Sequence, residues 1–332
     1  MVKEHLTVEE QVALLLKRGM LIQNVSDCSQ ALQKYGYYRL SGYWYQFRIR
    51  EQLGEETVTL ENFREGTSFE AIIEIYDFDR KLRQLVFEMT EQIEIAMRFH
   101  IGHVLGKVDP YAHENESLFQ QHFLELNKSG SMLSKHASLL NAIGRELNRS
   151  SEDFVAHHKN RHEGHLPIWA ITEIMGFQHL YRLFAGILDK QQNIIAANIG
   201  ICTDSGVGLG GTLLNWLENI HHIRNLCAHH SRLWNRRIAT NLKMNHLRPV
   251  PETRHIFENF RIETANKNPV PNMSTSRIYA TLTVLLTLNQ KLALDPGWKG
   301  RLVTHLHTLP KPGSLYQMGF PADWTAQPVW SN

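Results

Sequence analysis

The stretch SFEAIIEIYDFDRKLRQLVFEMTEQIEIAMRFHIGHVLG, from Ser68 to Gly106, carries the pattern that decides the fold. Its apolar residues recur three or four positions apart, which gathers them on one face of an α-helix. They are Ile72, Ile75, Tyr76, Leu82, Leu85, Val86, Met89, Ile93 and Met97. The spacing predicts one long amphipathic helix, or two nearly continuous ones.

Similar periodicity recurs along the rest of the chain, whereas few stretches alternate as strands do. Further helices are predicted at Val8–Arg18, Ser134–Leu147, Pro167–Leu188, Thr212–Arg237 and Ser274–Leu294. Turn-forming residues separate them at NKSGSM near Gly130, TDSGVGLGG from Thr203 and NKNPVPNM from Asn266. The sequence therefore predicts an all-α fold.

We predict three regions in this fold. Residues 1–65 form an N-terminal helical extension, and residues 66–295 form a helical bundle. Residues 296–332 hold Pro and Trp without periodicity, which predicts an irregular C-terminal arm packed on the bundle.

The bulk composition excludes several classes of protein. A formal net charge of +2 over 332 residues is not that of a duplex binder with a broad basic surface, so any site for a polyanion must be local. Three widely separated cysteines indicate neither a disulfide framework nor a thiolate zinc site. The chain shows no signal peptide and no apolar run of about 20 residues, so we expect a cytoplasmic protein without a membrane contact.

Two motifs resemble ligand sites but have simpler explanations. GVGLGG, Gly206–Gly211, is not a true dinucleotide fingerprint and lacks the lysine of a phosphate loop, which favours a helix-entry loop. His158 and His162 are four residues apart, as metal ligands sometimes are, but no carboxylate or thiolate stands at a matching spacing. We therefore predict neither a metal site nor a cofactor.

Two further patterns are interpreted as structural. The pairs Asp77/Lys81, Asp79/Arg83 and Glu94/Arg98 have the i, i+4 spacing of helix-stabilising ion pairs. The aromatic cluster YGYYRLSGYWYQF, Tyr35–Phe47, surrounds Arg39 and could stack nucleic-acid bases. Packing in the core of an N-terminal helical hairpin is the preferred interpretation.

The stretch HHIRNLCAHHSRLWNRR, His221–Arg237, concentrates four histidines and four arginines. If it is helical throughout, one polar stripe holds His221, His222, Asn225, His229 and Arg232, with Arg224 at its edge. The opposite arc, which would face the core, holds Trp216, Ile220, Ile223, Leu226, Cys227, Leu233 and Trp234. His230 falls in the apolar arc and is predicted to be packed in the core.

Histidine and arginine together suit phosphodiester chemistry. Histidine exchanges a proton near neutral pH, and arginine offers a planar fork to phosphate oxygens. The alternative interpretation of the stripe is a solvated polar face that carries a few ion pairs.

RNLCAHH, Arg224–His230, closely resembles the R-N-x-x-x-H signature of HEPN ribonucleases. The wider chain resembles the abortive-infection (Abi) family of bacterial phage-defence proteins, in its AbiD/AbiF-like branch. The stretches that carry this resemblance are LLKRGMLI, YGYYRLSGY, YDFDRKLR, IEIAMR, LPIWAITEIMGF, SRLWNRR and GFPADW.

The resemblance implies an all-α HEPN bundle that homodimerises around a shared cleft and cuts RNA without metal. The motif assigns catalysis to Arg224 and His229, with Asn225 in support, and His221, His222, Glu94 and Arg98 are further supporting candidates. It also implies a toxin-like growth arrest on infection and control by a regulatory or inhibitory RNA partner.

These expectations define a mechanism. His229 serves as general base or acid on the RNA 2′-hydroxyl and the leaving 5′-oxygen, and Arg224 stabilises the phosphorane. A two-fold dimer would supply a second His229. The basic residues expected to guide single-stranded or looped RNA are Arg232, Arg236, Arg237, Lys243 and Arg248. The rival hypothesis is a non-catalytic RNA-binding or protein-interaction module of a defence system.

Overall fold

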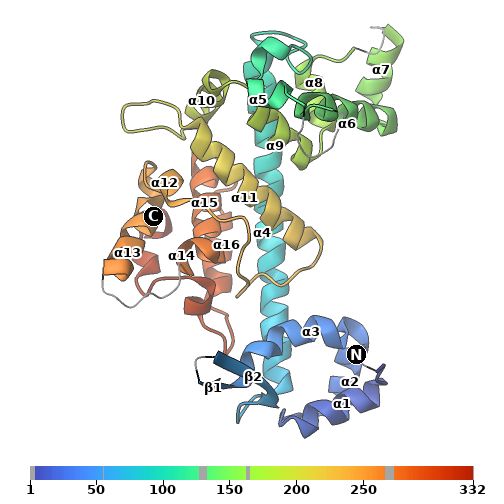
Figure 1. The fold of residues 1–332 in the computed structure, drawn as a ribbon, viewed down its shortest axis with the longest axis vertical. Coiled ribbons are helices and arrows are strands. Elements are labelled where there is room, and N and C mark those ends of the chain that lie inside the picture. Colours follow the sequence, from blue (N-terminus) through green and yellow to red (C-terminus); the bar gives the residue numbers. More distant parts are fainter. Residues whose placement is uncertain (1–3, 55, 127–132, 162–164, 266–272, 332) are drawn as a thin grey trace.

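The computed structural model describes residues 4–54, 56–126, 133–161, 165–265 and 273–331. The predicted all-α character is confirmed, because helices account for most of the described chain. The stretch that begins at Ser68 forms one helix, α4 (Phe69–Gly106), whose first turn is capped by the Ser68 side chain. Helix α4 runs along the long axis of the molecule, and the other elements pack around it (Figure 1).

The N-terminal elements gather at one end of α4 (Figure 1). They are α1 (Val8–Lys17), α2 (Val25–Tyr35), α3 (Tyr37–Trp44), the 3₁₀ turn η1 (Tyr45–Phe47), β1 (Arg48–Leu53) and β2 (Glu56–Phe63). The antiparallel hairpin β1–β2 is a departure from the predicted N-terminal helical extension, which otherwise consists of helices. Thr57, Val58 and Thr59 explain it, since β-branched side chains favour extended backbone.

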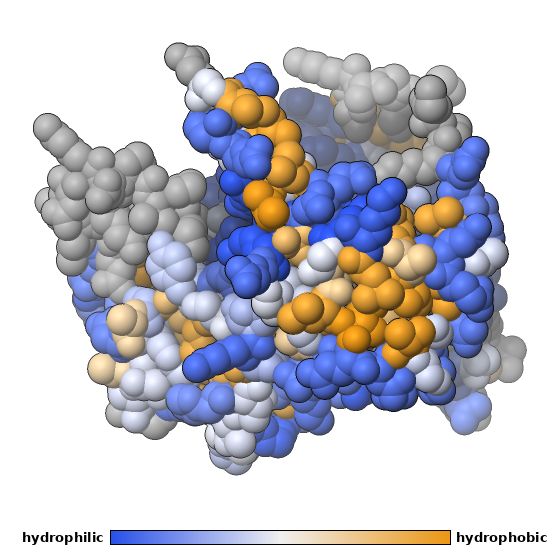
Figure 2. Space-filling model, turned by 90° about the horizontal axis from the view of Figure 1, so that it is seen from below, coloured by the Kyte–Doolittle hydropathy of each residue, from blue (hydrophilic) through white to orange (hydrophobic). Residues whose placement is uncertain are grey.

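The aromatic cluster of this region is largely a packing feature, as predicted. Tyr43, Trp44 and Phe47 are buried, whereas Tyr38 and Tyr45 are exposed. Seen from this end, the molecule also presents an exposed apolar area bordered by polar side chains (Figure 2).

The opposite end of α4 carries a second group of short helices (Figure 1). They are η2 (Glu116–Leu118), α5 (Gln121–Leu124), α6 (Lys135–Arg149), α7 (Asp153–Arg161), α8 (Ile168–Ile174), α9 (Phe177–Gly186) and α10 (Asp189–Asn198). The single helix predicted over Pro167–Leu188 is two helices, because Met175 is extended and Gly176 opens a new one. A Cβ at Gly106 would lie 2.7 Å from Cε3 of Trp169, so glycine permits the close approach of α8 to α4.

The C-terminal half builds the flank beside α4 (Figure 1). Its elements are α11 (Gly210–Ala228), α12 (Met244–Leu247), α13 (Pro251–Ala265), α14 (Met273–Ser276), α15 (Ile278–Lys291), α16 (Trp298–Leu306), η3 (Leu315–Met318), η4 (Trp324–Ala326) and α17 (Pro328–Ser331). Helix α15 is buried nearly all round and forms the centre of this half. No helix in the described ranges combines the length and apolarity that crossing a membrane requires.

The C-terminal tail is more regular than predicted. Helix α16 lies inside the arm expected to be irregular, and Trp298 Nε1 donates to the carbonyl of Leu85 on α4 at 2.9 Å. Its pattern was missed because the helix is short and begins directly after Pro296 and Gly297.

The glycine-rich segment at Gly206–Gly211 enters α11, as expected. A Cβ at Gly208 would lie 1.8 Å from the carbonyl oxygen of Asn193, and one at Gly210 would meet Gln192 at 2.6 Å. These glycines therefore allow the loop to pack tightly against α10.

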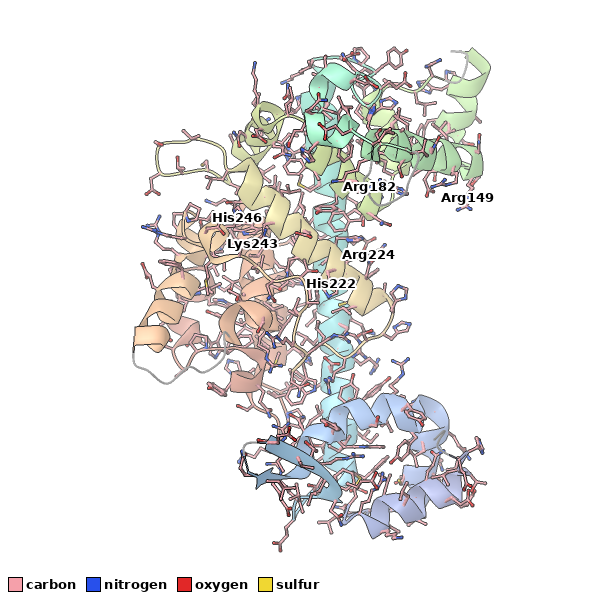
Figure 3. All side chains as sticks on the ribbon, in the orientation of Figure 1. Arg149, Arg182, His222, Arg224, Lys243 and His246 are labelled. Carbon is pink, nitrogen blue, oxygen red and sulfur yellow. The ribbon has the colours of Figure 1, made fainter. Side chains whose placement is uncertain are left out.

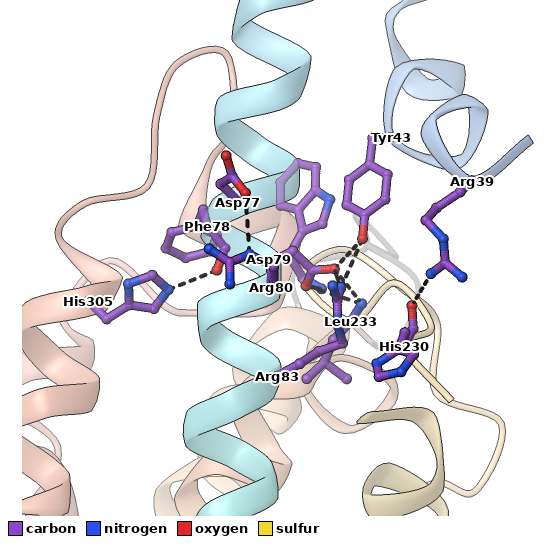
Figure 4. Close-up of polar contacts among 11 residues, drawn as sticks. Arg39, Tyr43, Asp77, Phe78, Asp79, Arg80, Arg83, His230, Leu233 and His305 are labelled. Atoms are coloured by element: carbon purple, nitrogen blue, oxygen red, sulfur yellow. Dashed lines mark hydrogen bonds and ion pairs between the residues drawn. The ribbon is translucent and has the colours of Figure 1, made fainter. Parts of the chain in front are cut away.

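Asp79 of α4 binds three separate parts of the chain (Figure 4). Its fully buried carboxylate forms an ion pair with Arg83 and accepts a hydrogen bond from the hydroxyl of Tyr43 on α3 at 2.6 Å. It also accepts the backbone N–H groups of Leu233, at 3.1 Å, and Trp234, at 2.7 Å. Burial raises the pKa of Tyr43, as does the neighbouring carboxylate, so its hydroxyl remains a donor.

The predicted ion pairs along α4 form with one exception. Asp79 pairs with Arg83 and Glu94 with Arg98, at the expected spacing. Asp77 instead contacts Arg80, with Nε and Oδ1 3.3 Å apart, rather than Lys81.

Asp79→Asn should lower the free energy of unfolding by about 3–5 kcal/mol, because it leaves the buried Arg83 guanidinium without its counter-charge. Asp77→Asn is the matched control: its ion pair is exposed and should contribute less than about 1 kcal/mol. Urea denaturation followed by circular dichroism measures both. Equal losses in the two variants would contradict the central role given to Asp79.

Candidate functional site at the end of helix α11

The apolar face of α11 is buried as the sequence predicts. Trp216, Ile220, Ile223, Leu226 and Cys227 are all in the core. This packing leaves the remaining faces of the helix to the polar residues of the motif, with Arg224 and His222 near the crossing of α11 over α4 (Figure 3).

Helix α11 ends at Ala228, well before the predicted end at Arg237. His230 adopts the left-handed conformation with φ of 55°. Its N–H donates to the carbonyl of Cys227 at 3.0 Å, and the N–H of Ser231 donates to the carbonyl of Leu226 at 2.8 Å. This pair of bonds is a Schellman motif, in which glycine usually holds the position of His230.

The contacts of the following residues explain the stop. Arg39 of α3 donates to the carbonyl of His230 at 2.7 Å, and the Asp79 carboxylate accepts hydrogen bonds from the backbone N–H groups of Leu233 and Trp234 (Figure 4). These tertiary bonds satisfy backbone groups that a longer helix would have used.

The early stop changes the predicted environment of His230 but not that of its neighbour His229. The prediction that His230 packs in the core is wrong: both His229 and His230 are exposed. Leu233 and Trp234 are buried as predicted, although they reach the core from an irregular segment.

Arg224 lies against two residues of α4. Its Nε is 3.9 Å from Oε2 of Glu94, and its guanidinium lies 5.5 Å from the ring centroid of Phe87. The other oxygen of Glu94 is 2.7 Å from Nη2 of Arg98, which also donates through Nη1 to the carbonyl of Glu173. The nearly buried carboxylate of Glu94 thus stands between two guanidinium groups: it holds Arg98 by a short ion pair and lies within 3.9 Å of Arg224.

Asn225 and His221 form the second part of the site. Asn225 Nδ2 lies 3.0 Å from His221 Nε2, and the His221 ring is parallel to that of Tyr181, with Phe177 edge-on. Burial lowers the pKa of His221, and the nearby charges of Arg224 and His222 lower it further. A neutral imidazole can accept a hydrogen bond from the Asn225 amide, and this bond fixes both side chains.

His229 stands one turn beyond Asn225 as the C-cap of α11. Its backbone N–H donates to the carbonyl of Asn225 at 2.9 Å, while its imidazole is exposed. An exposed proton carrier therefore lies at the end of the helix that also holds Arg224 and Asn225.

The other predicted residues are less closely grouped. His222 is partly buried, and burial lowers its pKa, with a further contribution from Arg236. Its Nε2 has no hydrogen-bond partner among the described residues.

The basic residues predicted to guide RNA do not lie together on one surface. Arg232 lines a separate cavity with Arg48 and Arg277. Lys243 is exposed beside α12, and Figure 3 shows it across α11 from Arg224. Exposed Arg237 and Arg248 also stand on the segments after the motif, Arg248 with its guanidinium 5.3 Å from the ring centroid of Phe257.

Sequence reasoning missed the partners supplied by other helices. Phe87, Phe177 and Tyr181 contact Arg224 or His221 from α4 and α9. Their places in amphipathic helices indicate packing, and nothing in their spacing points to α11.

The described part of the chain contains no group of three or more metal-binding side chains. Nδ1 of His158 lies 2.8 Å from the carbonyl oxygen of Phe154, within α7. His162, the second member of the candidate pair, lies outside the described residues.

Comparison with known proteins identifies the family. Residues 30–235, more than half of the chain, match the family described as Abi-like protein, and the chain belongs to it. No curated protein and no solved structure matches the chain. Membership suggests a role in abortive infection, the defence of bacteria against phage.

His230→Gly should raise the free energy of unfolding by up to about 1 kcal/mol, because glycine adopts the left-handed conformation without steric cost. The matched control is His229→Gly, at a φ of −87°. It should lower the same free energy by about 0.5–1 kcal/mol through the entropy of the unfolded chain. Thermal and urea unfolding of both variants provide the measurement, and a destabilised His230→Gly would contradict the assigned motif.

Proposed function

We propose that the protein is a metal-independent endoribonuclease of phage defence. The observation that carries the proposal is the grouping at the end of α11: an exposed His229, an Asn225 fixed by His221, and an Arg224 loosely paired with Glu94. Its match to the R-N-x-x-x-H signature supports an RNA substrate.

The proposed reaction uses only groups of the chain and the RNA. An imidazole accepts the 2′-hydroxyl proton as that oxygen attacks the adjacent phosphorus, and a protonated imidazole donates to the leaving 5′-oxygen. Arg224 stabilises the charge of the phosphorane. The products are a 2′,3′-cyclic phosphate and a 5′-hydroxyl.

One His229 per subunit serves one proton transfer at a time, so we propose a homodimer that pairs two copies of the site. Ile95 and Phe99 of α4 support this arrangement, since they are 57% and 60% exposed and stand directly beside Glu94 and Arg98 in the sequence. Trp169 of α8 is 51% exposed and lines the same cavity as Phe99 and Arg98. A two-fold contact through these exposed residues would bring the Arg224 and His229 sites of the two subunits next to each other.

In a cell, this activity would arrest growth on infection, and a partner RNA would hold it in check. Substrate would be single-stranded or looped RNA, whose splayed backbone can enter a cleft between subunits. Arg236 and Arg237, six and seven residues after the motif, would contact the phosphates.

Purified protein should cleave labelled RNA in excess EDTA, and His229→Ala should reduce the rate by about 10²–10⁴-fold, the usual contribution of a general acid or base. Arg224→Ala should reduce it by a similar order through lost charge stabilisation. His157→Ala, at an exposed histidine of α7, is the control and should cleave normally.

Product analysis tests the chemistry of the same reaction. A single 2′-deoxy substitution at the cut site should abolish cutting there, because the nucleophile is removed. Full activity of His229→Ala, or magnesium-dependent 5′-phosphate products, would refute the mechanism. RNA binding without cleavage would instead favour the non-catalytic module.

Phe99→Glu should convert the dimer to a monomer and reduce cleavage at least 10-fold, because it places a charge in the apolar contact. Val207→Glu, at a loop residue with 59% exposure, is the matched control and should change neither property. Analytical ultracentrifugation and the cleavage assay measure the two effects. A monomeric Phe99→Glu with normal activity would show that each subunit works alone.

A further inference from the structure

A second basic site borders the segment that follows α11, of which Arg232 and Asn235 line it. Five arginines line a cavity of about 640 Å³: Arg48 and Arg50 of β1, Arg64 after β2, Arg232, and Arg277 at the start of α15. The sequence gives no sign of this cluster, because its members come from four segments spread over most of the chain.

No carboxylate of the described chain lies within ion-pair distance of these five arginines, although Asp79 acts on Arg232 from farther away. Among the described residues that line it, none is acidic. The five guanidinium groups form no ion pair with a carboxylate in the described chain, whereas Arg18, Arg83, Arg98 and Arg301 all do. Burial lowers the pKa of Arg232 and of Arg277. Arg236 and Arg277 lower that of Arg232 further, against the opposing effect of Tyr43 and Asp79, and Arg237 lowers that of Arg277 further. Grouping like charges in this way raises the energy of the empty site and favours an anionic ligand.

The floor of the cavity is organised by polar contacts. Oε1 of Gln46 accepts from Asn235 Nδ2 at 2.8 Å and from Gln317 Nε2 at 3.0 Å. Arg64 donates through Nη2 to the carbonyl of Gln46, and Arg277 donates through Nη1 to that of Asn235. Each bond uses one donor and leaves the other donors of the guanidinium for a ligand.

Arg48 adds an unsatisfied donor. Its Nε is buried without a hydrogen-bond partner in the described chain, and its guanidinium lies 5.5 Å from the centroid of the Tyr45 ring. A buried donor without a partner costs free energy that a bound acceptor would recover.

We propose that this arginine cavity binds a nucleotide through its phosphate chain, in the manner of a nucleoside triphosphate. Arginine forks match phosphate oxygens, and a volume of this size suits a small ligand rather than an extended strand. Tyr316 lines the same cavity with 57% exposure, so its ring is available to stack on a base, whereas Tyr45 already has the Arg48 guanidinium over its ring. The site is separate from His229 and Arg224, and its occupancy does not depend on RNA cleavage.

Isothermal titration of the full chain with ATP, inorganic triphosphate, adenosine and an unphosphorylated RNA oligomer tests the proposal. ATP and triphosphate should bind, with affinities that fall as salt rises, and adenosine should not. The double variant Arg50→Gln/Arg64→Gln should weaken ATP at least 10-fold. Both arginines are exposed, so matching unfolding temperatures should show an intact fold.

Two control variants and one variant of the cavity lining locate the binding. Arg149→Gln, on α6 at the far end of the molecule, should leave ATP affinity unchanged (Figure 3). His229→Ala should also bind normally, which separates this site from the proposed catalytic one. Tyr316→Ala should weaken ATP but not triphosphate.

Three outcomes would overturn the proposal: no binding of ATP or triphosphate, equal affinity in the double variant and the wild type, or an RNA oligomer that binds more tightly than ATP through Arg50 and Arg64. The last result would assign the cavity to an RNA strand.

Discussion

The buried carboxylate of Asp79 is the interaction on which the rest of the architecture depends. It lies on the central helix α4 and receives Tyr43 from α3, Arg83 from its own helix, and the backbone of Leu233 and Trp234 from the segment after α11. A buried charge is tolerated only when its hydrogen-bonding capacity is met, and here that requirement draws three parts of the chain together. The position of the N-terminal module relative to α11 is therefore set by a polar contact as well as by packing.

The same contact determines where the proposed active site begins. Once Leu233 and Trp234 donate to Asp79, the chain must leave the axis of α11, and the left-handed His230 provides the turn. Arg39 secures the turn by binding its carbonyl. As a result, His229 stands at an exposed helix end rather than in the middle of a helical face, where neighbouring turns would restrict access to it.

Local patterns predicted the helices well, because the periodic burial of a helix depends on the order of neighbouring residues in the sequence. The long run from Ser68 and the apolar face of Trp216, Ile220 and Ile223 are examples. The prediction for His230 failed because it assumed a helix up to Arg237. The acceptor that ends the helix, Asp79, lies 154 positions from Leu233 in the sequence. Of the candidate site, the sequence predicted the motif residues, and it named Glu94 as a supporting candidate. The contacts of Phe87 and Tyr181 with the motif are tertiary contacts, which no spacing in the sequence encodes. The same is true of the separation of Arg232 from the other basic residues.

The distribution of arginine explains how a chain with a net charge of +2 can hold two basic sites. Arg83 and Arg98 are paired with carboxylates on α4 and act as structural or orienting groups. Arg224 is only loosely paired, with 3.9 Å to Glu94, so it keeps donors for a phosphate. The five arginines of the second cavity have no carboxylate partner in the described chain. Arg232 and Asn235 belong to the segment that follows α11. A polyanion bound in that cavity would therefore contact the same segment that carries His229 and donates to Asp79. Local pairing, rather than total charge, decides which of these cations remain free to bind an anion.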